Sequence, residues 1–219
     1  SGETMTKTKR EPAVAVTVTA LTKTFTLARP IADDDGRSYA TLTIAEPRLL
    51  HKMQVQRRQL TGAAPTPPGS TVPLPPITSA VEGTIALMAL LASVPESAIR
   101  KLKMRDAEAI RLWIETRNSE GVKADEQLTA DDALAAGEHT FVLLSPVETN
   151  TAQRTHITVR EPDLEAAIAM ESRRTEAERM AALIASLSDW VIPEVQRLAQ
   201  RDVDRIERWL GFFSPAGAD

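Results

Sequence analysis

Apolar and polar residues alternate in two pairs of short segments, one pair in each half of the chain. In the first half the segments are 25–27 and 41–44, and in the second half they are 141–143 and 157–159. Period-two alternation places the apolar side chains on one face of a half-buried strand. We therefore predict two strands in each half. The alternating valines of 14–18 predict one more strand in the first half.

The strands of the first half are joined by Asp33-Asp34-Asp35-Gly36. Gly36 can supply the positive φ that a hairpin turn needs. The aspartates resemble the start of a calcium-binding loop, but no glutamate closes such a loop at the required spacing. The corresponding segment, Thr149–Arg154, has neither the glycine nor the acids. A turn is therefore favoured over a metal site.

A helix is predicted after each second strand, where Glu46-Pro47 and Glu161-Pro162 occur. Proline suits the first helical position, and a glutamate beside it interacts favourably with the helix dipole. Both helices then carry apolar residues four positions apart, which places them on one face. These residues are Leu49 and Met53 in the first half and Leu164 and Ile168 in the second.

Two further helices are predicted in each half. The apolar positions of 85–91 correspond to those of 181–187, and a proline follows each stretch at Pro95 and Pro193. The last helix is expected to start at an aspartate, because aspartate caps the free backbone N–H groups of a first helical turn. The two residues are Asp106 and Asp202, which precede the apolar stripes containing Trp113 and Trp209.

The matched segments occur in the same order in both halves, which indicates one structural unit copied twice. The predicted fold class is α+β, with each unit a β-hairpin or small antiparallel sheet followed by about three helices. The first unit covers 12–118, a linker covers 119–138, and the second unit covers 139–214. Only the first unit carries a proline-rich insert, 61–79, which favours an extended loop of polyproline character. Within the linker, Thr129–Ala136 predicts a short capped helix.

Composition narrows the class of protein. The chain has 219 residues, 42% of them hydrophobic but only 4% aromatic, and a net charge of −4. This charge does not indicate a nucleic-acid-binding protein. The absence of cysteine excludes disulfides and thiol catalysis. No apolar run approaches the roughly 20 residues that span a bilayer. For 13–21 a strand is favoured over a signal peptide, and we expect a protein of the reducing cytoplasm.

No catalytic or metal-binding pattern is apparent in the sequence. His51, His139 and His156 fall in different predicted elements and are interpreted as surface or edge residues. There is no glycine-rich phosphate loop and no Gly-x-Ser-x-Gly motif. The acids that recur in both halves are explained by helix capping. We therefore predict that the protein is not an enzyme and has no cofactor and no metal.

Four aromatic residues are the candidate partner-binding residues. Trp113 and Trp209 recur at one position of the last helix, where a core role is favoured over docking. Phe212 and Phe213 have no counterpart in the first half. Aromatic residues often contribute much of the binding energy at interfaces, so these four are retained as candidates.

The ordered motifs resemble the tail assembly chaperone family of bacteriophages, the group typified by the Mu-like tail chaperone, in two tandem copies. Family members usually resemble a single such unit. The segments that carry the resemblance are 29–31, 42–47 and 102–106 in the first half, and 145–147, 157–162 and 198–202 in the second.

The resemblance implies a non-catalytic function in virion morphogenesis. Chaperones of this family are expected to bind the phage tape measure protein and to assist assembly of the tail tube protein, in the host cytoplasm. No nucleic-acid or membrane partner is implied, and self-association is left open. The alternative is a structural component of the virion, such as a tail-tube-associated or tail-completion protein.

Overall fold

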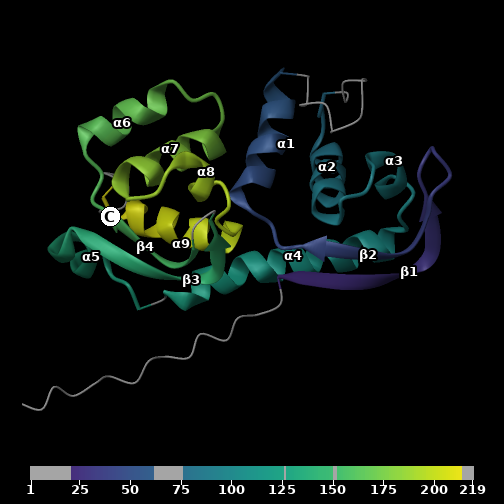
Figure 1. Ribbon diagram of the computed structural model, residues 1–219, viewed down its shortest axis with the longest axis horizontal. Coiled ribbons are helices and arrows are strands. Elements are labelled where there is room, and N and C mark those ends of the chain that lie inside the picture. The colour runs from purple at the N-terminus through teal and green to yellow at the C-terminus, as the bar shows by residue number, and fades with distance from the viewer. Residues whose placement is uncertain (1–20, 62–75, 126, 150–151, 214–219) are drawn as a thin grey trace, which may run out of the picture.

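The computed structural model describes residues 21–61, 76–125, 127–149 and 152–213. These residues form two units side by side, each with an antiparallel hairpin covered by helices (Figure 1). The first unit runs from β1 to α4 and the second from β3 to α9, with α5 ahead of it. The predicted α+β class is confirmed, and so are the two hairpins.

Each unit contains one short helix that the sequence did not predict. α3 and α8 are single turns, in which Pro95 is the residue before the helix and Pro193 is its second residue. The first unit consists of β1 (Thr22–Ala32), β2 (Ser38–Ala45), α1 (Leu49–Thr61), α2 (Ala80–Ala92), α3 (Glu96–Ile99) and α4 (Met104–Ala124). The second part of the chain consists of α5 (Ala130–Ala136), β3 (Glu138–Glu148), β4 (Gln153–Arg160), α6 (Leu164–Glu171), α7 (Glu176–Leu187), α8 (Ile192–Val195) and α9 (Gln200–Gly211).

The turn between β1 and β2 agrees with its prediction. Gly36 has a φ of +81°, and the Asp33 carboxylate accepts hydrogen bonds from the Arg37 N–H (2.8 Å) and the Tyr39 hydroxyl (2.9 Å). Thr129 caps α5 as predicted, since its side chain accepts the Asp132 N–H. The strand expected at 14–18 and most of the proline-rich insert lie outside the described residues.

The last helix of each unit is hydrogen-bonded to a bulge in the first strand of that unit. Strand pairing is interrupted between Thr26 and Ile31 in β1 and between Val142 and Val147 in β3. Asp106 accepts the Ala28 N–H at 3.1 Å.

Asp202 accepts the backbone N–H groups of Leu144 (2.9 Å) and Ser145 (3.2 Å). The helix-cap prediction for the two aspartates is therefore wrong. α4 and α9 begin two residues earlier, at Met104 and Gln200, and the carboxylates satisfy strand N–H groups that the bulge leaves unpaired.

The prediction of helix starts at the Glu-Pro pairs is also wrong. α1 begins at Leu49, and α6 begins at Leu164 with Asp163 as its capping residue. Both prolines therefore precede their helices. α6 has 8 residues, fewer than the three turns expected.

α1 lies between α2 and α7, and thus between the two units (Figure 1). Its Leu49 and Met53 are buried in the hydrophobic core of the second unit, not in that of the first. The core of the first unit is formed around Leu42, Ile44 and Ile110. The two units thus share one helix across their boundary.

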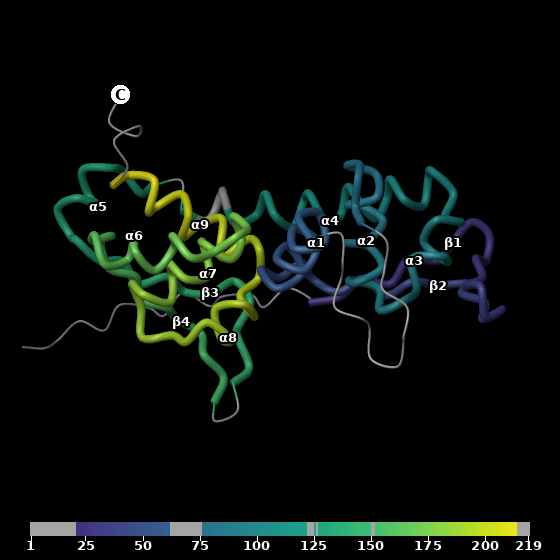
Figure 2. Tube along the Cα trace, turned by 90° about the horizontal axis from the view of Figure 1, so that it is seen from above, coloured from purple at the N-terminus to yellow at the C-terminus, as the bar shows by residue number. Residues whose placement is uncertain are grey.

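α4 extends from the first unit to the second, as the view from above shows (Figure 2). Its second half packs on α9, where Gly121 lies against the backbone of Arg201. A Cβ atom at this glycine would lie 2.9 Å from the Arg201 carbonyl carbon, too close for a side chain. α4 crosses the boundary predicted at residue 118, and the division into 12–118, 119–138 and 139–214 stays a prediction.

Candidate interaction site at the junction of the units

The start of α1 is bound to the second unit through the backbone. The N–H groups of Leu49 and Leu50 donate to the carbonyls of Leu198 and Gln196, each at 3.0 Å. The Gln200 N–H donates in return to the Pro47 carbonyl at 2.8 Å. These bonds fix the position of α1 against the turn that precedes α9.

Side chains extend this contact along α1. Leu49 and Met53 are only 1% and 2% exposed. Further along the helix, the Gln56 side chain accepts the Ala177 N–H at 2.9 Å, and Arg57 forms an ion pair with Glu178. The junction therefore combines a buried apolar contact with a polar rim.

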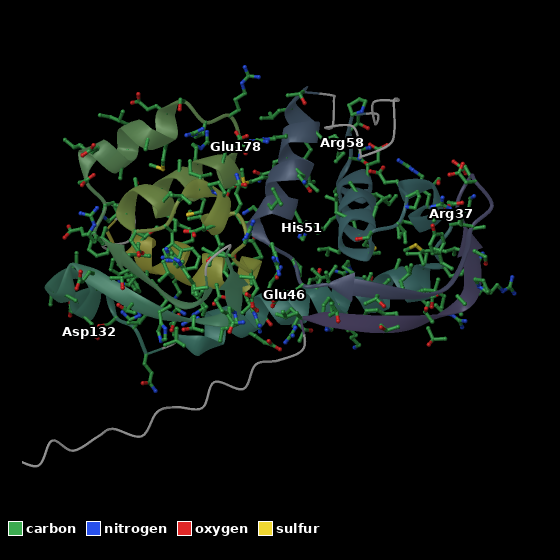
Figure 3. All side chains as sticks on the ribbon, viewed as in Figure 1. Arg37, Glu46, His51, Arg58, Asp132 and Glu178 are labelled. Atoms are coloured by element: carbon green, nitrogen blue, oxygen red, sulfur yellow. The ribbon has the colours of Figure 1, made fainter. Side chains whose placement is uncertain are left out.

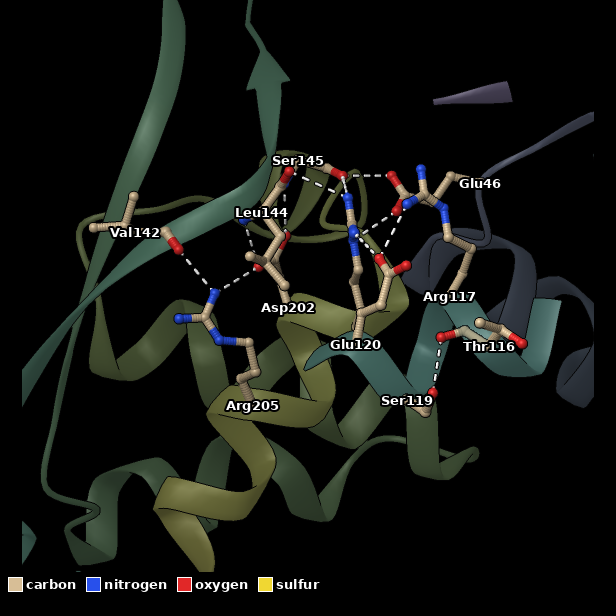
Figure 4. A network of polar contacts seen from close by, with 11 residues as sticks. Glu46, Thr116, Arg117, Ser119, Glu120, Val142, Leu144, Ser145, Asp202 and Arg205 are labelled. Atoms are coloured by element: carbon tan, nitrogen blue, oxygen red, sulfur yellow. Dashed lines mark hydrogen bonds and ion pairs between the residues drawn. The ribbon is translucent and has the colours of Figure 1, made fainter. Parts of the chain in front are cut away.

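The buried side chain of Arg201 interacts with Glu46, Glu120 and Ser145, three residues that are labelled in Figure 4. The Arg201 guanidinium contacts Glu46 and Glu120, each at 2.7 Å, and donates to the Ser145 hydroxyl at 2.8 Å. Its side chain is 2% exposed and that of Glu46 5%. A buried charge lowers the stability of the fold unless it is paired, so Arg201 and its three partners depend on one another. Glu46, interpreted from the sequence as a helix-end charge, instead links the units.

A second arginine, Arg205, extends the network (Figure 4). It donates to the Val142 carbonyl at 2.8 Å and to Asp202 at 3.0 Å, and it pairs with Asp125 at 2.5 Å. Burial raises the pKa of Asp202, and the strand N–H groups and nearby arginines oppose this rise. The network joins α4, β3 and α9.

His51 lies in the first turn of α1 (Figure 3). Burial and the charge of Arg48 lower the pKa of His51 to about 4. Its Nδ1 accepts the Arg48 N–H at 3.1 Å, which requires that nitrogen to be unprotonated. His51 is half-buried, so it is not a freely exposed surface residue.

The other two histidines lie on the second hairpin, His139 on β3 and His156 on β4. His139 packs edge-to-face on Phe141, with ring centroids 4.5 Å apart, and His156 is exposed on β4. Within the described ranges, no three histidine or acidic side chains are grouped so that they could hold a metal ion.

An open groove of about 520 Å³ lies between α1, α2, α4 and α9. Apolar atoms make up most of its lining, and polar side chains from both units also line it. Val55, Leu87 and Ile114 contribute apolar surface, while Gln59 and Asp204 are among the polar residues.

The four aromatic candidates belong to two separate cores. Trp113 packs edge-to-face with Phe25 in the first unit, at 6.2 Å between centroids. Trp209 is 1% exposed in the second unit, and Phe213 packs on it at 4.8 Å. Phe212 is partly buried against the same core. A docking role for these residues stays a prediction.

Comparison with known proteins gives a match to a family of phage proteins. Residues 140–214 match the sequence model of the family described as "Phage tail assembly chaperone proteins, E, or 41 or 14". The matched segment is about a third of the chain and lies in the second unit. This match supports a tail assembly chaperone role. A search of the curated proteins and of the solved structures found no match.

None of the helices in the described part of the chain combines the length and the apolar character that a membrane crossing requires.

Proposed function

We propose that this protein is a phage tail assembly chaperone that binds the tape measure protein and assists assembly of the tail tube. It acts by reversible binding in the host cytoplasm, without catalysis and without a cofactor. The observation that carries this proposal is the match of residues 140–214 to the tail assembly chaperone family.

We assign a chaperone-like unit to each half, 12–118 and 139–214, although the family match covers only the second. The same order of strands and helices supports this assignment. So does the contact of Asp106 and Asp202 with the bulge of the first strand, because it recurs at the same place in both units.

The groove at the junction is the proposed binding surface for the tape measure protein. Long tape measure helices expose apolar stripes, and an amphipathic helix binds by placing such a stripe in an apolar groove. The mostly apolar lining of the groove and the polar residues within it fit a partner of this kind. Phe212 and Phe213, partly exposed after α9, are a second proposed contact.

Co-expression with the neighbouring tape measure protein tests this function. We expect the tape measure protein to become soluble and to co-purify with this chain. Val55→Glu places a charge in the groove and should abolish co-purification. Leu60→Glu is the matched control, because Leu60 lies on the same helix, is 60% exposed and does not line the groove.

Two results would overturn the proposal. One is a tape measure protein that precipitates to the same extent with and without this chain. The other is the presence of this chain at stoichiometric level in purified particles, since a chaperone leaves the finished tail. The second result would instead favour a structural tail component.

A further inference from the structure

The two units differ in how their first helices are covered. α1 and α6 follow the Glu-Pro pair of their own unit and begin with the corresponding residues Leu49 and Leu164. Leu49 is 1% exposed, whereas Leu164 is 85% exposed. Four residues further on, Met53 is 2% exposed and Ile168 is 66% exposed. The face that α1 buries in the second unit is thus uncovered in α6.

The surface that receives α1 also has an uncovered counterpart, which lies on the first unit. Ala177, the second residue of α7, is covered by α1 and 1% exposed, whereas Val81, the second residue of α2, is 68% exposed. Gln200 and Met104 are the first residues of α9 and α4, and they are 8% and 82% exposed.

The charges at the junction are repeated as well. Glu46 binds Arg201, the second residue of α9. The second residue of α4 is Arg105, whose side chain is 72% exposed and whose ion partner is the adjacent Asp106 at 3.8 Å. The counterpart of Glu46 is Glu161, which is exposed ahead of α6.

An open pocket of about 500 Å³ lies at Arg105, lined by Ala28, Arg29, Lys103 and Arg105. The pocket is basic. Its position on the first unit corresponds to the position on the second unit where Glu46 is bound. There, Glu46 contacts Arg201 and the hydroxyl of Ser145, which is the counterpart of Arg29. A carboxylate arriving from outside would therefore meet a positively charged pocket.

We propose that this protein associates head to tail with further copies of itself. α6 of one copy lies on the first unit of the next, with Leu164 over Val81 and Met104 and with Glu161 in the pocket at Arg105. The contact repeats the internal junction between the units. Because its two sides are different surfaces, the association is open-ended and produces chains of copies, not closed pairs.

The contact between copies is weaker than the internal junction. Inside the chain, the second half of α4 adds its packing on α9 and the pairing of Glu120 with Arg201. α9 ends at Gly211 and does not extend in the same way. Association therefore depends on protein concentration. The inference does not rest on the tail-assembly function.

Analytical ultracentrifugation of the full chain over a wide concentration range tests the inference. The wild-type sedimentation coefficient should rise continuously with concentration. Leu164→Asp and Val81→Asp, both at exposed positions, should each remain monomeric and folded by circular dichroism. Leu134→Asp is the matched control, because Leu134 is an exposed apolar residue of α5 that is not among the proposed contact residues, and it should associate like wild type.

Mixing the two monomeric variants gives the sharpest result. Leu164→Asp keeps an intact receiving surface and Val81→Asp keeps an intact α6, so an equimolar mixture should form a one-to-one dimer and nothing larger. Glu161→Arg and Arg105→Glu should each weaken association, and the double variant should restore it.

A wild-type chain that stays monomeric at all concentrations would overturn the inference. So would association of Val81→Asp at the wild-type level. If Leu164→Asp self-associates normally but loses the tape measure protein, α6 is a surface for that partner and the inference is wrong.

Discussion

Replacing Leu49 with alanine tests the sharing of α1 between the units. Leu49 lies on an element of the first unit but is buried in the core of the second. The substitution removes three carbon atoms, each worth about 0.8 kcal/mol of transfer free energy. A cavity term adds to this, because a packed core closes only in part. We expect the free energy of unfolding to fall by about 3 kcal/mol.

Leu164→Ala is the control, since Leu164 is the corresponding residue of α6 and is 85% exposed. Its effect on the free energy of unfolding should stay within about 0.5 kcal/mol. Urea denaturation followed by circular dichroism measures both values, at a protein concentration low enough to keep the chain monomeric. Hydrogen exchange adds a local measurement, because Leu49→Ala should speed exchange of the amides in α7.

The reasoning would be refuted if the two substitutions had equal and small effects. It would also be refuted if Leu49→Ala speeded exchange in the first unit alone. Either result would mean that α1 is not part of the second core.

Four further predictions concern single positions. Gly121→Ala should lower the free energy of unfolding by about 2 kcal/mol or more, because the added methyl group overlaps the Arg201 backbone. Gly83→Ala should be neutral or stabilising by up to about 1 kcal/mol in the same urea assay, since the nearest atom to an added Cβ is 3.6 Å away; equal losses for both glycines would contradict this packing. The pKa of His51 is lowered from 6.5 to about 4, so the stability from its neutral form is complete above pH 6.5 and declines as the pH falls towards 4. The free energy of unfolding should decline by up to about 3 kcal/mol over this range. Urea titrations from pH 7 to pH 4 should show a smaller decline for His51→Gln, and a variant with the same pH profile as wild type would contradict this contribution of His51. Thr175→Ala should cost about 1 kcal/mol, because it removes the capping box of α7, and a thermal midpoint equal to wild type would contradict that contribution.

The hairpins and the main helices could be predicted because their patterns are local. Alternation around Phe25 and Phe141 identifies strands whatever lies next to them, and the glycine at 36 identifies the turn. The prolines at 95 and 193 follow the second predicted helix of each unit, and each also lies at the start of a one-turn helix. Periodicity does not detect such short elements, since one turn offers too few positions.

The junction could not be predicted because its contacts join residues distant in sequence. Asp202 looked like a helix cap, but the N–H groups that it accepts belong to a strand 57 and 58 residues earlier. Leu49 and Leu164 have the same local pattern, and only the presence of a neighbouring unit makes one buried and the other exposed. Arg58 is likewise buried in an ion pair with Glu96, which follows it by 38 residues.

The continuity of α4 has a consequence for how this protein can vary. A flexible connection between domains tolerates insertions, but one residue added within an α-helix rotates everything after it by about 100°. An insertion near residue 118 would turn Gly121 away from Arg201 and would carry Glu120 out of its ion pair. The spacing between the two units is therefore set by helical phase. Changes of length between them are permitted only in steps that preserve this phase, so the pair is expected to be inherited as one block.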